Sequence, residues 1–152
     1  MGDRRGGRDE VPDAGRGPVI DTLGALAHEL SAESVTVGEL VERLGRSGTD
    51  MGGSVVVEHP ALDGVARAGV VRQANGDAPA LVTLELSRPL PVGELEAAFG
   101  RPRSIHPDHV GEPVTLLYEL DLPGRPFDVA LLATDDEGGS RRLTLRRDIR
   151  LG

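Results

Sequence analysis

The chain has 152 residues, a length that suits one domain with a core large enough to need no disulfide or metal staple. It contains no cysteine, so thiolate chemistry and cysteine-ligated metal or iron–sulfur sites are excluded, and no cofactor is predicted. Its formal net charge of -8 argues against a nucleic-acid partner, because phosphate binding requires clustered cations.

Composition also sets expectations about where the protein works. No apolar run reaches the roughly 18 residues that a membrane-spanning helix needs, so no membrane partner is predicted. The N-terminal arginines are not followed by an apolar segment, so no secretory signal is predicted and a cytoplasmic location is expected. All 17 basic residues are arginine, which together with the many alanines and glycines is typical of a GC-rich bacterial genome.

The chain begins with a segment that has no hydrophobic period. Residues 1–18 mix glycine, arginine, aspartate and proline, which predicts a disordered tail followed by a single α+β domain at 19–152. The residues after this tail place one apolar stripe at helical spacing. They predict a helix from about Ile20 to Leu30.

One stretch of eleven residues occurs twice, at 36–46 and at 91–101, with six identical positions. Apolar residues in the first copy recur at helical spacing, so each copy predicts a short helix. Three apolar segments follow each copy. The sequence therefore predicts two αβββ repeat units, at about 36–87 and 91–150, that build an antiparallel sheet of about six strands in an α+β fold.

The ends of these two helices carry capping signals. The helices are expected at about Thr36 to Leu44 and Pro91 to Phe99. Thr36 with Glu39 three residues later has the spacing of a capping box. Gly45 and Gly100 stand where a left-handed C-terminal cap is expected.

Six apolar segments predict the strands of the sheet. They cover about 55–58, 65–71, 81–86, 114–122, 127–133 and 143–145. In the third segment Val82, Leu84 and Leu86 share one side. Glu85 points to the other side, as in an antiparallel sheet with one face covered by helices and one face wet. The alternative architecture is a β-sandwich with residues 20–44 as an appended helical hairpin.

Turn residues separate these strands. Asn75-Gly76 is a strong hairpin signal, so the strands before and after it should pair antiparallel. The segment Leu122–Arg125 has proline and glycine at the central positions of a type II turn. The segment Asp135–Gly139 is predicted to close the last hairpin.

The only candidate metal ligands with suitable spacing are His106, His109 and Glu112. Two histidines at i and i+3 with a nearby carboxylate can form part of a transition-metal site. Pro107 and Pro113 favour a solvated polar loop instead. Both interpretations stay open, with the polar loop favoured.

No catalytic residue is assigned. The chain has no lysine, which excludes a phosphate loop of the Gly-Lys-Ser/Thr type, and no serine has a Gly-x-Ser-x-Gly frame. General acid–base catalysis needs two carboxylates that converge in a pocket. The candidates are Glu85, Glu119, Asp121 and Asp128, and alternation places most of them on the wet side of the sheet.

The last predicted strand carries a basic cluster in an otherwise acidic chain. Alternation places Arg142, Arg146 and Arg150 on one side of it. Arginine binds carboxylates bidentately and is enriched at interfaces, so these three residues are the predicted contacts with an acidic protein partner. Two other interpretations stay open: the arginines pair with the outward carboxylates of other strands, or they protect a strand at the sheet edge. An edge strand could also accept a strand from another chain.

The favoured function is a non-enzymatic protein-interaction or regulatory module. The alternative is a small-molecule or metal-dependent enzyme with a pocket between helices and sheet. A deep pocket with convergent carboxylates or histidines would favour the enzyme. An open sheet face with an apolar patch would favour a protein partner.

Overall fold

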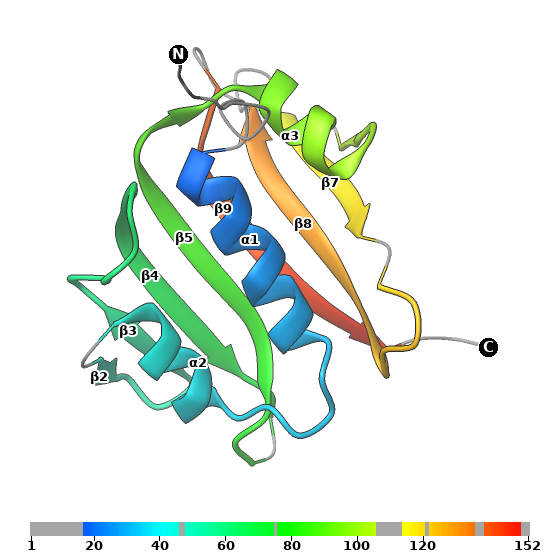
Figure 1. Ribbon diagram of the computed structural model, residues 1–152. Helices are drawn as coiled ribbons and strands as arrows, with labels where there is room; N and C mark the ends of the chain where they lie inside the picture. Colours follow the sequence, from blue (N-terminus) through cyan, green and yellow to red (C-terminus); the bar gives the residue numbers. More distant parts are fainter. Residues whose placement is uncertain are drawn as a thin grey trace, which may run out of the picture.

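The computed structural model describes residues 17–45, 48–74, 76–105, 114–120, 122–135 and 139–149. Within these ranges the chain is an α+β protein with three helices and one antiparallel sheet of eight strands (Figure 1). The helices are α1 (Gly17–Leu30), α2 (Val37–Leu44) and α3 (Val92–Phe99). The strands are β2 (Thr49–Asp50), β3 (Ser54–Val57), β4 (Val65–Arg72), β5 (Pro79–Leu90), β6 (Arg103–Ile105), β7 (Val114–Leu120), β8 (Phe127–Asp135) and β9 (Ser140–Ile149).

The sheet consists of two meanders that meet at its centre. The strand order is β2-β3-β4-β5-β9-β8-β7-β6, and every neighbouring pair is antiparallel. The last strands of the two meanders pair with each other, with Val82 opposite Leu145 and Leu84 opposite Leu143. Both halves of the chain therefore share one sheet.

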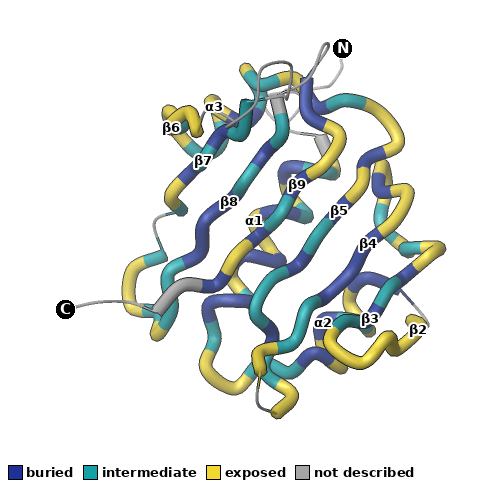
Figure 2. The backbone as a smooth tube through the Cα atoms, turned by 180° about the vertical axis from the view of Figure 1, so that it is seen from behind, coloured by how far each residue is buried: buried dark blue, intermediate teal, exposed yellow. Residues whose placement is uncertain are grey.

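All three helices lie on the same face of the sheet (Figure 1), and none of the described helices covers the opposite face (Figure 2). Helix α1 crosses the centre of the sheet over β8 and β9, α2 packs on β3 and β4, and α3 lies beside α1 and β7. The core between helices and sheet consists of aliphatic side chains and Tyr118. The predicted alternation is confirmed in β5, because Val82, Leu84 and Leu86 are buried while Glu85 is exposed.

The three helices form where the sequence predicts them. Helix α1 begins at Gly17 and so includes the last two residues of the predicted tail; residues 1–16 lie outside the described ranges. The capping box of α2 is confirmed: the Glu39 N–H donates to Thr36 Oγ1 at 3.1 Å, and the Thr36 N–H donates to Glu39 Oε1 at 2.9 Å. These bonds satisfy donors that a helix start leaves unpaired. None of the described helices has the length and apolar character needed to cross a bilayer.

The two glycines that follow α2 and α3 behave differently. Gly100 has a positive φ of 89°, which favours glycine, but its ψ of -169° differs from that of the predicted left-handed cap. The prediction for Gly45 is wrong, because its φ of -177° is ordinary extended backbone. A Cβ at Gly45 would lie 3.0 Å from Val57 Cγ1 and 3.4 Å from the His59 carbonyl oxygen. Gly45 therefore permits a close approach of chain segments and does not form a left-handed cap.

The predicted number of strands and the position of the last strand need correction. The sheet has eight strands instead of six, because the two- and three-residue strands β2 and β6 form its edges. The β-sandwich alternative is wrong, since all eight strands belong to one sheet. The interpretation of the last strand as an edge is also wrong: β9 lies between β5 and β8. From Leu143 to Arg146 β9 is paired on both sides, with β5 and with β8, so strand addition along this stretch is excluded.

The predicted hairpins are present. Strands β4 and β5 pair antiparallel around Gly76, whose φ is 87°; Asn75 lies outside the described residues. The turn at 122–125 is confirmed by a φ of 79° at Gly124 and by the Arg125 N–H, which donates to the Leu122 carbonyl at 3.3 Å. Strands β8 and β9 pair antiparallel, and residues 136–138 between them are not described.

Candidate functional site

The uncovered face of the sheet carries a row of uncharged residues that crosses six strands. Each member is the register partner of the next, and we call them the neutral row. Its members, from β3 to β7, are Val56, Gly69, Thr83, Thr144, Leu132 and Leu117. At a strand spacing of about 4.8 Å the row is about 24 Å long. All of its members except the buried Gly69 are half-buried.

The predicted arginines flank this row on its two sides. Arg142 and Arg146 are exposed on β9, two residues before and two residues after Thr144. Both therefore share the open face with Thr144. Arg146 stands between Leu81 of β5 and Ala130 of β8 in the register. Arg150 lies outside the described residues.

The register also bears on the interpretation that these arginines pair with acids of the sheet. Glu85 lies directly opposite Arg142 and also opposite Arg67 of β4, so charges alternate along this line of the face. Glu119 instead forms an ion pair with Arg103 of β6, at 3.1 Å. Arg142 is therefore placed where it can pair with Glu85 within the sheet.

The open face is hollowed at Gly69. A cavity of about 130 Å³ lies at Gly69, between Arg67 and Glu85. It exists because Gly69 has no side chain between its taller neighbours on β3 and β5. A Cβ there would lie 3.1 Å from Thr83 Oγ1.

Arg147 is the arginine of β9 whose role the sequence did not reveal. Alternation along β9 places it on the same side as Leu143 and Leu145, facing the core, where it is 9% exposed. Its Nε donates to the Leu30 carbonyl at 2.9 Å, its Nη2 donates to the Ala32 carbonyl, and its guanidinium lies 3.9 Å from the centre of the Phe127 ring. Burial lowers the pKa of Arg147 from its ordinary value.

A second arginine binds the same end of α1. Arg125 Nε donates to Ser31 Oγ at 2.9 Å, and its Nη2 donates to the His28 carbonyl at 3.0 Å. The last turn of a helix exposes unpaired carbonyls and the negative end of the helix dipole, so cations stabilise it. Arg125 and Arg147 therefore have a structural role that no sequence motif signals, because their acceptors, which are backbone carbonyls and the Ser31 hydroxyl, lie far along the chain.

A larger cavity lies between the helices and the sheet. It has a volume of about 560 Å³ and is bounded by the first turn of α1, the end of β5 and the start of α3. Glu94 is the one carboxylate among its described lining residues, which include no histidine. The convergent titratable groups that would favour an enzyme are thus not found among these residues.

The other predicted site residues do not form a described site. His106, His109 and Glu112 lie outside the described residues, and the part of the chain that is described contains no group of three potential metal ligands. Among the catalytic candidates, Glu85 and Glu119 are exposed on the sheet. Asp128 is half-buried and Asp121 is not described.

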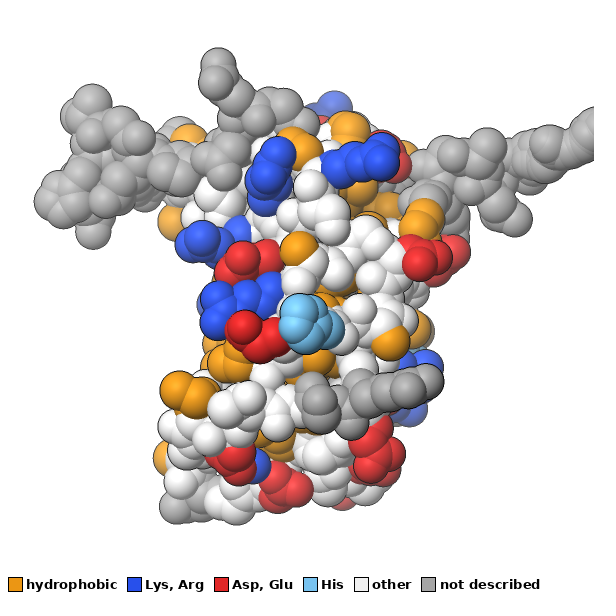
Figure 3. Space-filling view, turned by 90° about the vertical axis from the view of Figure 1, so that its left-hand side faces the viewer, with side chains coloured by type: hydrophobic (Ala, Val, Ile, Leu, Met, Phe, Trp, Pro, Cys, Tyr) orange, Lys and Arg blue, Asp and Glu red, His pale blue; other side chains and the backbone are white. Residues whose placement is uncertain are grey.

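Ion pairs cover the β2–β3 edge of the sheet, where acidic and basic side chains lie next to one another (Figure 3). Arg72 of β4 binds both carboxylate oxygens of Asp50, each at 3.1 Å, and lies 3.6 Å from Asp77. It also donates to the Gly52 carbonyl at 2.9 Å. The hydrogen bonds from Arg72 and then from the Gly52 N–H lower the pKa of Asp50 from 3.8.

Comparison of the chain with protein-family models, with curated proteins and with solved structures found no match.

Proposed function

We propose that the protein is a non-enzymatic interaction module of the bacterial cytoplasm that binds an acidic protein partner through the open face of its sheet. The observation that carries this proposal is the neutral row, flanked by Arg142 and Arg146. The predicted contact Arg150 belongs to the same proposal, because it follows Arg146 at an interval of four residues.

The layout of the face supports this proposal. Protein interfaces combine a core depleted of charge with a polar rim, and arginine is enriched in them. The open face is arranged in the same way. Uncharged side chains lie along its middle line, and charged side chains lie on both sides of that line. Leu117 and Leu132 supply apolar contact area, and the hollow at Gly69 can accept a side chain of the partner.

Charge supports the choice of an acidic partner. Arg142 and Arg146 are exposed cations beside the neutral row, and arginine holds carboxylates in bidentate pairs. Such contacts accelerate association and weaken as salt increases. Binding in this mode requires the acidic partner to compete with Glu85 for Arg142.

The test is affinity capture from a native bacterial lysate with the wild type and with an Arg142/Arg146/Arg150→Ala triple variant. We expect the wild type to retain a partner that the triple variant loses, and retention should decrease at high ionic strength. A Thr144→Glu variant, which puts a charge into the neutral row, should also lose the partner. Arg43→Ala is the matched control, because Arg43 lies on α2 and pairs with Glu29 on the other side of the sheet.

Two results would contradict this proposal. Recovery of the same partner by the wild type and by the triple variant would exclude the arginines as contacts. A thermal melt in which the triple variant has lost its folded state would show that the arginines hold the sheet together instead. The second candidate function is a small-molecule enzyme, and the cavity of about 560 Å³ between helices and sheet is the observation that favours it.

We also propose that the two halves of the domain arose by duplication. In each half a helix of eight residues is followed by a meander of four strands, and the outermost strand in both is short. The six identities between 36–46 and 91–101 support the same origin. A half-against-half comparison in related chains would test it, and unrelated profiles for the two halves would contradict it.

A further inference from the structure

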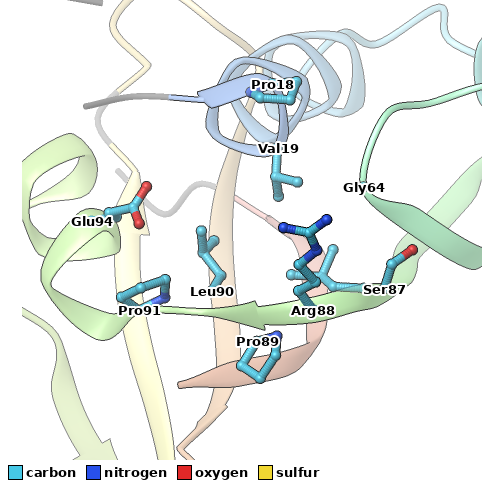
Figure 4. A pocket seen from close by; sticks show the side chains of 10 residues that line it. Pro18, Val19, Gly64, Ser87, Arg88, Pro89, Leu90, Pro91 and Glu94 are labelled. Atoms are coloured by element: carbon cyan, nitrogen blue, oxygen red, sulfur yellow. The ribbon is translucent and has the colours of Figure 1, made fainter. Parts of the chain in front are cut away.

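The cavity on the helical side of the sheet has the size and the wall of a small-molecule site. Its volume of about 560 Å³ falls within the range of about 300 to 1,000 Å³ that is usual for such sites. Most of its lining is apolar and consists of Val19 of α1, Leu86 and Leu90 of β5, and the prolines Pro18, Pro89 and Pro91 (Figure 4).

Two opposite charges face this apolar space. The Arg88 guanidinium points into the cavity beneath the first turn of α1, and the Glu94 carboxylate lies on the other side of Leu90 (Figure 4). Within the described part of the chain, neither side chain forms an ion pair or hydrogen bond. Both groups are therefore available to a ligand.

The N-terminal ends of α1 and α3 also contribute to the electrostatics at the two ends of the cavity. The described first turn of α1 contains no acidic residue, so its positive dipole end adds to the charge of Arg88. Glu94 lies in the first turn of α3, where its carboxylate offsets the dipole of that helix. One end of the cavity thus favours an anion, and the other end favours a cation.

We propose that this cavity binds a small zwitterion with an apolar body, whose carboxylate lies at Arg88 and whose ammonium lies at Glu94. Because the two protein charges stand on either side of Leu90, the ligand must span that side chain. An α-amino acid carries both charges on one carbon, whereas a dipeptide separates them by about 3.5 Å more of extended chain, so we choose a hydrophobic dipeptide as the ligand class to test.

The first experiment measures binding of three probes to the full chain by titration calorimetry. The probes are the dipeptide Leu-Leu, its N-acetyl derivative and its C-terminal amide. We expect saturable binding of Leu-Leu, and about tenfold weaker binding of each blocked derivative, because each loses one charge-assisted contact. Absence of saturable Leu-Leu binding, or equal affinity for all three probes, would overturn the proposal.

The second experiment assigns the two charges to the two ends of the ligand. Arg88→Gln should weaken Leu-Leu binding about tenfold and leave the affinity for the amide unchanged. Glu94→Gln should weaken Leu-Leu binding similarly and leave the affinity for the N-acetyl derivative unchanged. Arg43→Gln, at an arginine of α2 that does not line the cavity, is the control and should bind all three probes like the wild type. Unchanged Leu-Leu binding by Arg88→Gln would refute the assignment. This site and the open face are independent, so either can fail without the other.

Discussion

At the scale of single residues, the arginines of β9 show how one strand serves two purposes. Arg142 and Arg146 point to the open face, whereas Arg147, on the opposite side, is buried against the end of α1. A buried guanidinium loses hydration and must recover hydrogen bonds within the protein. Arg147 recovers them by donating to the carbonyls of Leu30 and Ala32, and its guanidinium also lies over the Phe127 ring.

This arrangement predicts a large effect of replacing Arg147. In Arg147→Met the carbonyls at the end of α1 lose charged donors, so the free energy of unfolding should decrease by about 2 to 3 kcal/mol. Arg142→Met is the matched control on the same strand, and its effect should stay below about 1 kcal/mol because the side chain is exposed. Urea denaturation of both variants measures the difference. Equal losses would show that the contacts of Arg147 contribute no more than those of a surface arginine.

At the scale of elements, the short strand β2 is held to the sheet by side chains as well as by backbone. It pairs with β3 through two residues, Thr49 and Asp50. Arg72 of β4 reaches past β3 to bind the Asp50 carboxylate and the Gly52 carbonyl. This fork fixes the hairpin that forms one edge of the sheet, where open backbone groups would otherwise invite pairing with another chain.

The Asp50 carboxylate should titrate below its ordinary pKa. Because its pKa in the folded protein is lowered, its contribution to stability is present above the unfolded pKa of about 3.9 and is lost as the pH falls through the folded value. A carboxyl-detected NMR titration should place the Asp50 midpoint below 3.8, and Arg72→Gln should raise it. Arg67→Gln is the control. Arg67 lies on the same strand as Arg72 but pairs with Glu58, at 3.0 Å. A midpoint that does not move in Arg72→Gln would contradict the assignment.

At the scale of the whole molecule, the pairing of β5 with β9 joins the two halves of the chain. The residues of this seam, such as Leu84 and Leu143, are buried in the common core, and α1 packs on β9 beside it. Each half has about 55 residues, which bury too little surface to be comfortably stable alone. The halves should therefore unfold together.

This cooperativity can be measured with a natural probe. Tyr118 is the only tyrosine and the chain has no tryptophan, so intrinsic fluorescence reports on β7 in the second half, whereas far-UV circular dichroism reports on the whole. The two signals should give the same urea midpoint. Leu84→Ala, on the first half of the seam, should shift both midpoints equally, with a loss of about 2 to 5 kcal/mol. Separate midpoints would show that the halves are loosely coupled.

The sequence by itself determined the local structure of this protein. Hydrophobic spacing predicted the three helices and the side chains of the strands that face the core. The pair Thr36 and Glu39 predicted the start of α2. Alternation also predicted that Arg142 and Arg146 share a side of their strand. These features follow from residues within a few positions of one another, so a linear pattern contains them.

Only the tertiary structure decided which strands are neighbours and which groups meet. It placed β9 at the centre, added the edge strands β2 and β6, and gave Gly45 a packing role in place of a capping role. The neutral row and the cavity at Arg88 arise in the same way, from strands and helix ends that are distant in sequence. Alternation specifies the face to which a side chain points, but backbone hydrogen bonds between strands have the same chemistry for every pair. The choice among possible strand orders therefore depends on how all the buried surfaces fit together.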